Sequence, residues 1–246
     1  MLFIIGTLVG SFLSLAIHRI PKGENITHKR SYCPNCNRLL GFSDLIPVLS
    51  YISLKGKCKQ CGLKISPRYL ILELGSGIIF LLLAISLQLS MQTISVQDGV
   101  KLGLLIIYIT TLLLIAGIDM KTFAISKGVL LFGLVLKVTY IIYLYVLGNN
   151  IYGYVIYLLA ILVLLVIETV YVKKKQEQLY PVEILVLCMY MALWTMQSVL
   201  VLTIIGAIFI MTIKGIPLGK NAPKMSIGAY MCFANIVILI ANNFVG

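Results

Sequence analysis

The segment Cys33-Pro34-Asn35-Cys36 is followed, after 21 intervening residues, by Cys58-Lys59-Gln60-Cys61. Two Cys-x-x-Cys motifs at this separation are typical of a zinc site, because each motif offers two thiolates on a tight turn and four thiolates complete a tetrahedron. A site closed by four protein ligands has no open position for water, so the expected Zn²⁺ is structural. Two disulfides or four unrelated thiols are the alternatives.

The cysteine motifs lie in a polar window, residues 19–68, of an otherwise apolar chain. The 246 residues are 60% hydrophobic and 11% charged, whereas soluble domains carry about 25% charged residues. This composition predicts an integral membrane protein. The net charge of +12 does not call for nucleic acid, because basic loops facing anionic lipids produce the same excess. We therefore expect anionic membrane lipids, and no nucleic acid, as partners.

Eight apolar stretches are long enough, or nearly so, to cross a bilayer. They cover residues 2–18, 69–91, 102–118, 128–147, 151–172, 181–196, 198–213 and 226–244. We predict an all-α polytopic membrane protein with about eight transmembrane helices and both termini external. All Lys and Arg residues except Lys101 and Lys137 then lie on the cytoplasmic side, as the positive-inside rule requires.

The window between the first two spans is expected to be cytoplasmic, since it holds half of the chain's 20 Lys and Arg residues. Cytoplasmic thiols stay reduced, which disfavours disulfides and favours zinc. Asp44 opens an apolar run, residues 45–49, that we expect to form a small core. The result would be a zinc-ribbon-like lobe between helices 1 and 2 that is too small to fold without metal.

The predicted organisation is a transmembrane helix over residues 1–18, a cytosolic four-cysteine zinc lobe over residues 19–68 and a seven-helix membrane region over residues 69–246. A stripe of small residues on the first helix would let another helix pack closely against it. The stripe consists of Gly6, Gly10 and Ser14.

Two carboxylates lie at the predicted cytoplasmic ends of different spans. Asp119 follows the span 102–118, and Glu183 lies at the start of the span 181–196. Carboxylates at helix ends are ordinary features of proteins. A facing pair, however, could share one proton, so that one carboxyl acts as a base on water and the other as an acid on a peptide carbonyl oxygen. The spacing alone leaves both interpretations open.

Several motifs resemble the signature of type IV prepilin peptidases. They are Gly10-Ser11-Phe12-Leu13, Arg19-Ile20-Pro21, the paired cysteines, Asp44-Leu45-Ile46-Pro47-Val48-Leu49-Ser50-Tyr51, Gly56-Lys57-Cys58, Arg68-Tyr69, Leu72-Glu73-Leu74, and Ile118-Asp119 with Thr122 and Ile125. The resemblance is most specific over residues 10–77 and looser afterwards.

This resemblance implies an aspartic endopeptidase of the bacterial cytoplasmic membrane that removes the leader from prepilins or pseudopilins. It also implies N-methylation of the new N-terminus with S-adenosylmethionine, a role associated with the cytosolic cysteine lobe. Asp119 would be one catalytic aspartate, and Glu183 takes the place of the other. The candidates for binding the methyl donor are Gly56, Lys57, Arg68 and Glu73.

The second catalytic motif departs from the family pattern. The family has Gly-x-Gly-Asp-x-Lys at the start of its sixth span, where this chain has Tyr180-Pro181-Val182-Glu183-Ile184-Leu185. Glutamate moves the carboxyl by one methylene, about 1.5 Å, and a misplacement of about 1 Å can cost on the order of 10²-fold in rate. Two further family motifs, Ile-Pro-Asp/Asn and Pro-Phe-Gly-Pro, become Ile125-Ser126-Lys127 and Ser226-Ile227-Gly228-Ala229.

Three hypotheses follow. The chain is an active but divergent prepilin peptidase that uses Asp119 and Glu183. Alternatively, its protease site is defective and it retains methyl transfer or prepilin binding. A third possibility is a membrane-anchored zinc module with a scaffold function.

Overall fold

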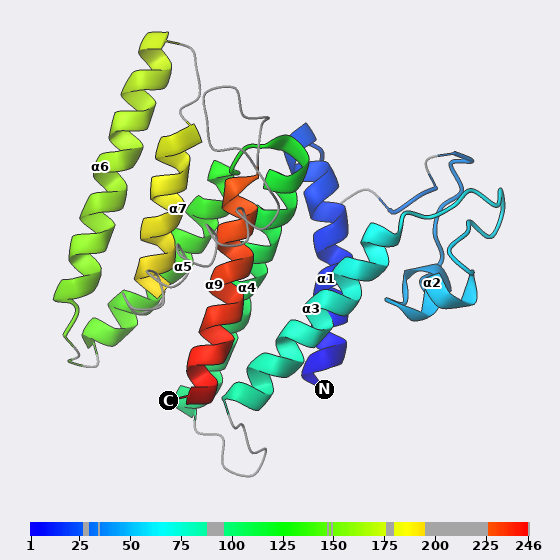
Figure 1. Ribbon diagram of the computed structural model, residues 1–246, viewed down its shortest axis with the longest axis horizontal. Helices are drawn as coiled ribbons and strands as arrows, with labels where there is room; N and C mark the ends of the chain where they lie inside the picture. Colours follow the sequence, from blue (N-terminus) through cyan, green and yellow to red (C-terminus); the bar gives the residue numbers. More distant parts are fainter. Residues whose placement is uncertain are drawn as a thin grey trace. The chain divides into compact units, whose positions relative to one another are not determined.

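The computed structural model describes residues 1–26, 30–33, 35–87, 96–146, 148, 150–175, 180–194 and 226–245. The chain divides into two compact units, Met1–Val100 and Lys101–Gly246. The first unit contains the helices α1 (Leu2–Arg19), η1 (Ile20–Lys22), η2 (Phe42–Leu45), α2 (Leu49–Ser53) and α3 (Pro67–Ser86) (Figure 1). The second contains α5 (Lys127–Val146), α6 (Tyr152–Lys175), α7 (Tyr180–Trp194), α9 (Ile227–Val245) and most of α4 (Val96–Thr122).

The prediction of an all-α polytopic membrane protein is confirmed. Five described helical segments are long and apolar enough to cross a membrane: Leu2–Lys22, Pro67–Ser86, Gly99–Thr122, Lys127–Val146 and Ile227–Phe244. Helices α6 and α7 contain shorter apolar stretches, Tyr152–Ile167 and Glu183–Ala192. The predicted span 198–213 lies outside the described residues.

Helices α1 and α3 pack side by side in the first unit (Figure 1). A Cβ on Gly6 would lie 2.6 Å from the Ser76 carbonyl oxygen, and one on Gly10 would lie 2.7 Å from the Leu72 carbonyl oxygen. The Ser76 hydroxyl donates a 2.7 Å hydrogen bond to the Gly6 carbonyl. Two of the three predicted small residues therefore form the close contact, whereas the Ser14 hydroxyl bonds within α1, to Ser11.

A lysine is buried within the second unit. Lys137, in the middle of α5, is only 4% exposed. Its Nζ lies 4.9, 5.1 and 4.6 Å from the ring centroids of Tyr140, Tyr154 and Trp194, which come from α5, α6 and α7. Cation–π contacts are worth about 2 kcal/mol when desolvated. These contacts explain how a lysine is accommodated in mid-span and why it joins three helices.

The glycine contact between α1 and α3 yields a stability prediction. We expect Gly6→Ala to lower the unfolding temperature, with a destabilisation of about 1–3 kcal/mol, because the added methyl meets backbone atoms that cannot move aside. The matched control is Gly75→Ala on α3, where a Cβ meets nothing within 4 Å. That change should be neutral or stabilising by up to about 1 kcal/mol. Equal melting temperatures for the two variants in detergent would contradict the packing argument.

Candidate metal centre and candidate active site

The two Cys-x-x-Cys motifs fold into equivalent turns. In each turn, the N–H of the first cysteine donates a hydrogen bond to the carbonyl oxygen of the residue five positions later. The carbonyl oxygen of the same cysteine accepts a hydrogen bond from the N–H of the residue four positions later. At 2.8–3.0 Å, these bonds join Cys33 to Arg38 and Asn37, and Cys58 to Leu63 and Gly62. Asn37 and Gly62 have φ values of +54° and +68°, a conformation that asparagine and glycine adopt at low cost. The repeated geometry places both cysteine pairs in the same local setting.

The four thiols gather in one place. The Sγ atoms of Cys33, Cys36, Cys58 and Cys61 all lie within 4.8 Å of one another. Sγ–Sγ distances across the two motifs are 3.8 Å for Cys33 and Cys61 and 4.0 Å for Cys36 and Cys58. A tetrahedral zinc with Zn–S bonds of about 2.3 Å separates its sulfurs by about 3.8 Å. The thiols are free rather than disulfide-bonded, so the donor set and its spacing fit Zn²⁺.

The pKa values of three of the four thiols differ, and they indicate why a cation would be favourable among the four. Backbone N–H groups of Cys36 and Asn35 lower the pKa of Cys33, and the Asn35 side chain lowers that of Cys61 to about 6. A hydrogen bond from the Arg38 backbone lowers the pKa of Cys36, but burial and the neighbouring thiols outweigh it and raise the value to about 11. Like charges at this spacing cannot all ionise, whereas a divalent metal stabilises four thiolates together.

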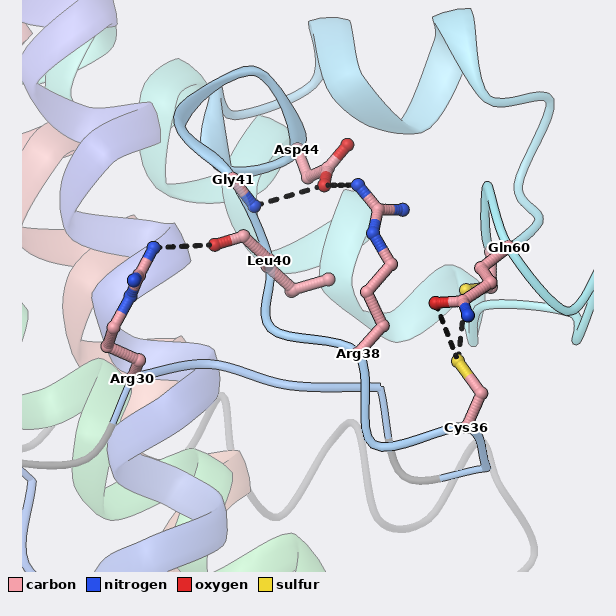
Figure 2. A network of polar contacts seen from close by, with 8 residues as sticks. Arg30, Cys36, Arg38, Leu40, Gly41, Asp44 and Gln60 are labelled. Carbon is pink, nitrogen blue, oxygen red and sulfur yellow. Dashed lines mark hydrogen bonds and ion pairs between the residues drawn. The ribbon is translucent and has the colours of Figure 1, made fainter.

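An ion pair supports the first cysteine turn. Arg38 donates to Asp44 Oδ2 at 2.7 Å, and the same oxygen accepts from the Gly41 N–H at 3.1 Å (Figure 2). The Asp44 side chain is 6% exposed. A buried carboxylate that has both a cation and an N–H partner is adequately satisfied. Asp44 therefore connects the residues after Cys36 to the start of η2.

The expected apolar core over residues 45–49 is wrong. Leu45, Ile46 and Leu49 are 43%, 48% and 64% exposed, and Phe42 is 91% exposed. Polar contacts organise the lobe instead, because its short turns are too small to enclose these side chains.

The predicted methyl-donor residues occupy different settings. Glu73, 8% exposed, accepts a 2.7 Å hydrogen bond from the Val48 N–H, and Val48 has a φ of +64°. Such a conformation costs a β-branched residue about 1–3 kcal/mol, so Glu73 fixes a turn and joins it to α3. Gly56, with a φ of +65°, lies against the Tyr51 ring. The Lys57 and Arg68 side chains are exposed. Their role with the methyl donor stays a prediction.

Asp119 is completely buried, in the last turn of α4. Its Oδ2 accepts a 2.9 Å hydrogen bond from the N–H of Ala229, at the start of α9. A Cβ on Gly228 would lie 3.0 Å from the same oxygen. Glycine at position 228 therefore allows the N-terminus of α9 to approach the carboxylate, where its partial positive charge is favourable.

Glu183 is 3% exposed and lies in the first turn of α7. Its Oε2 lies 3.5 Å from the N–H of Ile125, and its Oε1 lies 4.0 Å from Nζ of Lys127. Lys127 opens α5, where the helix dipole disfavours a cation. A lysine at the N-terminus of a helix is unfavourable unless a negative charge lies near it. The position of Lys127 in the sequence could therefore have indicated a nearby carboxylate such as Glu183.

Ile125 connects the two carboxylates. Its backbone faces Glu183, and its Cδ1 and Cγ1 lie 3.3 Å from the position that a Cβ on Gly228 would take. Asp119 Oδ2 lies 3.0 Å from that same position. Asp119 of α4 and Glu183 of α7 therefore both lie near Ile125, in the connection between α4 and α5. Their catalytic role remains a prediction.

Several apolar helices and a four-thiolate lobe define a class, that of polytopic membrane proteins with a zinc-ribbon-like lobe. Residues 4–87 match the bacterial peptidase A24 N-terminal domain. This match and the relatives below support the resemblance to type IV prepilin peptidases that the motifs indicated.

Similar proteins carry the name prepilin leader peptidase/N-methyltransferase. The protein from Myxococcus xanthus (strain DK1622) is 43% identical over 79 residues, which cover 32% of this chain and 24% of that protein. The protein from Klebsiella pneumoniae is 35% identical over 136 residues, 53% of this chain and 56% of the relative. The protein from Bacillus subtilis (strain 168) is 35% identical over 133 residues, which cover 53% of this chain and 49% of that protein. The chain thus spans about a quarter to just over half of these relatives. No solved structure matches it significantly.

The thiol geometry predicts one zinc ion per chain. We expect Cys61→Ser to lose most of the bound zinc and to expose residues 30–66 to protease, because the lobe lacks an apolar core to hold it without metal. Zinc content measured by atomic emission and limited proteolysis check this outcome. Cys188→Ser, in α7, is the matched control and should keep its zinc. Equal zinc content in both variants would exclude the four-thiolate site.

Proposed function

We propose that the chain is a membrane-embedded aspartic endopeptidase that removes the leader peptide of prepilins or pseudopilins and N-methylates the new N-terminus. The names of its relatives support both activities. The peptidase proposal is supported by the burial of two carboxylates, Asp119 and Glu183, that both lie near Ile125.

The proposed setting is the bacterial cytoplasmic membrane, with the cysteine lobe and the carboxylate pair at the cytoplasmic face and both termini outside. The distribution of Lys and Arg supports this orientation. Residues 69–246 would form the peptidase region, and the lobe would serve methyl transfer.

Lys127 gives the two carboxylates different roles. Glu183 lies 4.0 Å from the positive charge of Lys127 and in the first turn of α7, and both features favour a negative charge on this carboxyl group. Asp119 lies at the C-terminus of α4, whose partial negative charge is about half a unit, and at the N-terminus of α9, whose partial positive charge is similar. The effects of the two helix dipoles on the Asp119 carboxyl group therefore largely cancel. We therefore assign the role of the base to Glu183 and the role of the acid to Asp119.

The hydrolytic step follows from this division. Glu183 accepts a proton from water as the water oxygen bonds to the scissile carbonyl carbon, and Asp119 gives its proton to the carbonyl oxygen. When the tetrahedral intermediate collapses, the C–N bond breaks, the leaving amine takes a proton from Glu183, and one hydroxyl of the diol returns a proton to Asp119 as the carbonyl re-forms. The buried site keeps other water away from the pair.

Variants of the pair test the peptidase. Asp119→Asn and Glu183→Gln should each reduce cleavage of a co-expressed prepilin by at least about 10²-fold, since each removes one proton-transfer group. Lys127→Ala should reduce kcat with little change in KM, and Lys127→Arg should restore part of it because the cation returns. Gel mobility of the processed pilin and its kinetics report these effects.

Two controls sharpen this experiment. Lys101→Ala removes an exposed lysine of the same unit, and Glu24→Gln removes an exposed carboxylate whose partner is Lys22; both should cleave like the parent. If the Asp119 and Glu183 variants also cleave like the parent, the assignment of the pair is wrong. If the parent cleaves no prepilin encoded beside it, the methyl-transfer or prepilin-binding alternative replaces the peptidase.

S-adenosylmethionine supplies the methyl group when bound. Among the candidate residues, Glu73 of α3 is buried beside the lobe and accepts a hydrogen bond from the Val48 N–H. If Glu73 acts by fixing this turn, Glu73→Gln should retain methylation, because an amide oxygen also accepts from the Val48 N–H, whereas Glu73→Ala should lose it. Methyl incorporation into a pre-cut pilin measures both. Loss in both variants would indicate that the negative charge itself is needed, as for a ligand of the cationic sulfonium.

A further inference from the structure

The lobe presents an apolar segment to its surroundings. Helices η2 and α2 and the connection between them carry five exposed apolar side chains, Phe42, Leu45, Ile46, Leu49 and Ile52, which together we call the apolar segment. Three of them are 91%, 64% and 61% exposed, namely Phe42, Leu49 and Ile52. A single exposed leucine needs no explanation, but five large apolar residues within eleven positions mark a surface that is covered in the working protein.

The position of this segment along α3 indicates what covers it. The Val48 N–H, between η2 and α2, bonds to Glu73, the seventh residue of α3. Six rises of about 1.5 Å place Glu73 about 9 Å along the helix from Pro67. Helix α3 has 20 residues and is therefore about 30 Å long, the thickness of the hydrocarbon core. The bond thus holds α2 beside the first turns of a membrane-spanning helix (Figure 1).

Charge supports the same occupant. Lys55 and Lys57 follow α2 directly and are exposed, as is Arg68 at the start of α3. The two carboxylates nearest the segment do not oppose them, because Asp44 pairs with Arg38 and Glu73 bonds to Val48. Exposed apolar side chains next to lysines and arginines are the features of a helix that lies in the interface of an anionic bilayer.

We infer that the apolar segment is seated in the membrane, at the boundary between anionic headgroups and acyl chains, and that Glu73 sets its depth. Interfacial helices bury their apolar face about 5–10 Å into this boundary, which agrees with the depth of Glu73 along α3. The lobe would then be fixed against the bilayer by α1, by α3 and by this third contact. This inference does not depend on the proposed peptidase or methyl-transfer activities.

Site-specific photocrosslinking tests the seating. The full zinc-loaded chain carries p-benzoylphenylalanine at position 42 in one variant and at position 52 in another, and is irradiated in vesicles containing phosphatidylglycerol. Both positions replace exposed side chains, so folding should persist. We expect mass spectrometry to find lipid adducts at both, several-fold more than with the same probe at Lys59 in the second cysteine turn. Thermal unfolding of each variant verifies that the fold is intact.

The other results would overturn the inference. Crosslinks from positions 42 and 52 to a second protein chain would show that a protein covers the segment. Lipid yields equal to that at position 59 would show that the segment faces water. A further arm uses Glu73→Ala, which should lower the lipid yield at position 42 while the zinc content is unchanged. An unchanged yield would contradict the role of Glu73 in setting the depth.

Discussion

A carboxylate placed within an apolar helix must find its hydrogen-bond and charge partners inside the protein, because lipid offers none. Three buried carboxylates of this chain meet that constraint by reaching another segment. Glu73 accepts from Val48, Asp119 accepts from Ala229, and Glu183 lies beside Ile125 and Lys127. Each contact joins elements that are distant in sequence, so these polar contacts position the turns and helix ends around which both candidate sites are built.

The cysteine lobe uses a different solution to a related problem. It has too few residues for an apolar core, and most of its large apolar side chains are exposed. Its order comes from two equivalent turns, from the Arg38–Asp44 pair and from four thiols within 4.8 Å of one another. A metal bound by these thiols would supply free energy that burial cannot supply in such a small lobe. Lipid contact would then use the apolar surface that the lobe itself leaves uncovered.

The surroundings of the two carboxylates keep one residue of the family motifs, Gly228, and change another, Lys127. Gly228, the one glycine kept in the altered C-terminal motif, is where α9 approaches Asp119. Lys127, which replaces the usual Asp or Asn of another motif, is where Glu183 finds its cation. Glu183 and Lys127 depart from the family pattern in two separate motifs, and their side chains lie next to each other. The family motif has a lysine where this chain has Leu185, and Lys127 now supplies a cation beside the longer side chain of Glu183. The two changes are consistent with each other because both side chains lie near Ile125.

The sequence by itself determined the membrane class, five described helices long enough to cross a membrane and the four cysteines as a candidate metal site, because hydrophobic run length and Cys-x-x-Cys spacing are local signals. It also singled out Asp119 and Glu183 as candidates. Only the tertiary structure decided that both lie near Ile125, that Lys127 is the cation beside Glu183, and that Glu73 holds a lobe turn rather than facing water. Those contacts join residues 25 to 110 positions apart, and no local pattern encodes which distant partner satisfies a buried carboxylate. The apolar run after Asp44 was misassigned to a core because hydrophobicity alone does not distinguish protein from lipid as its surroundings.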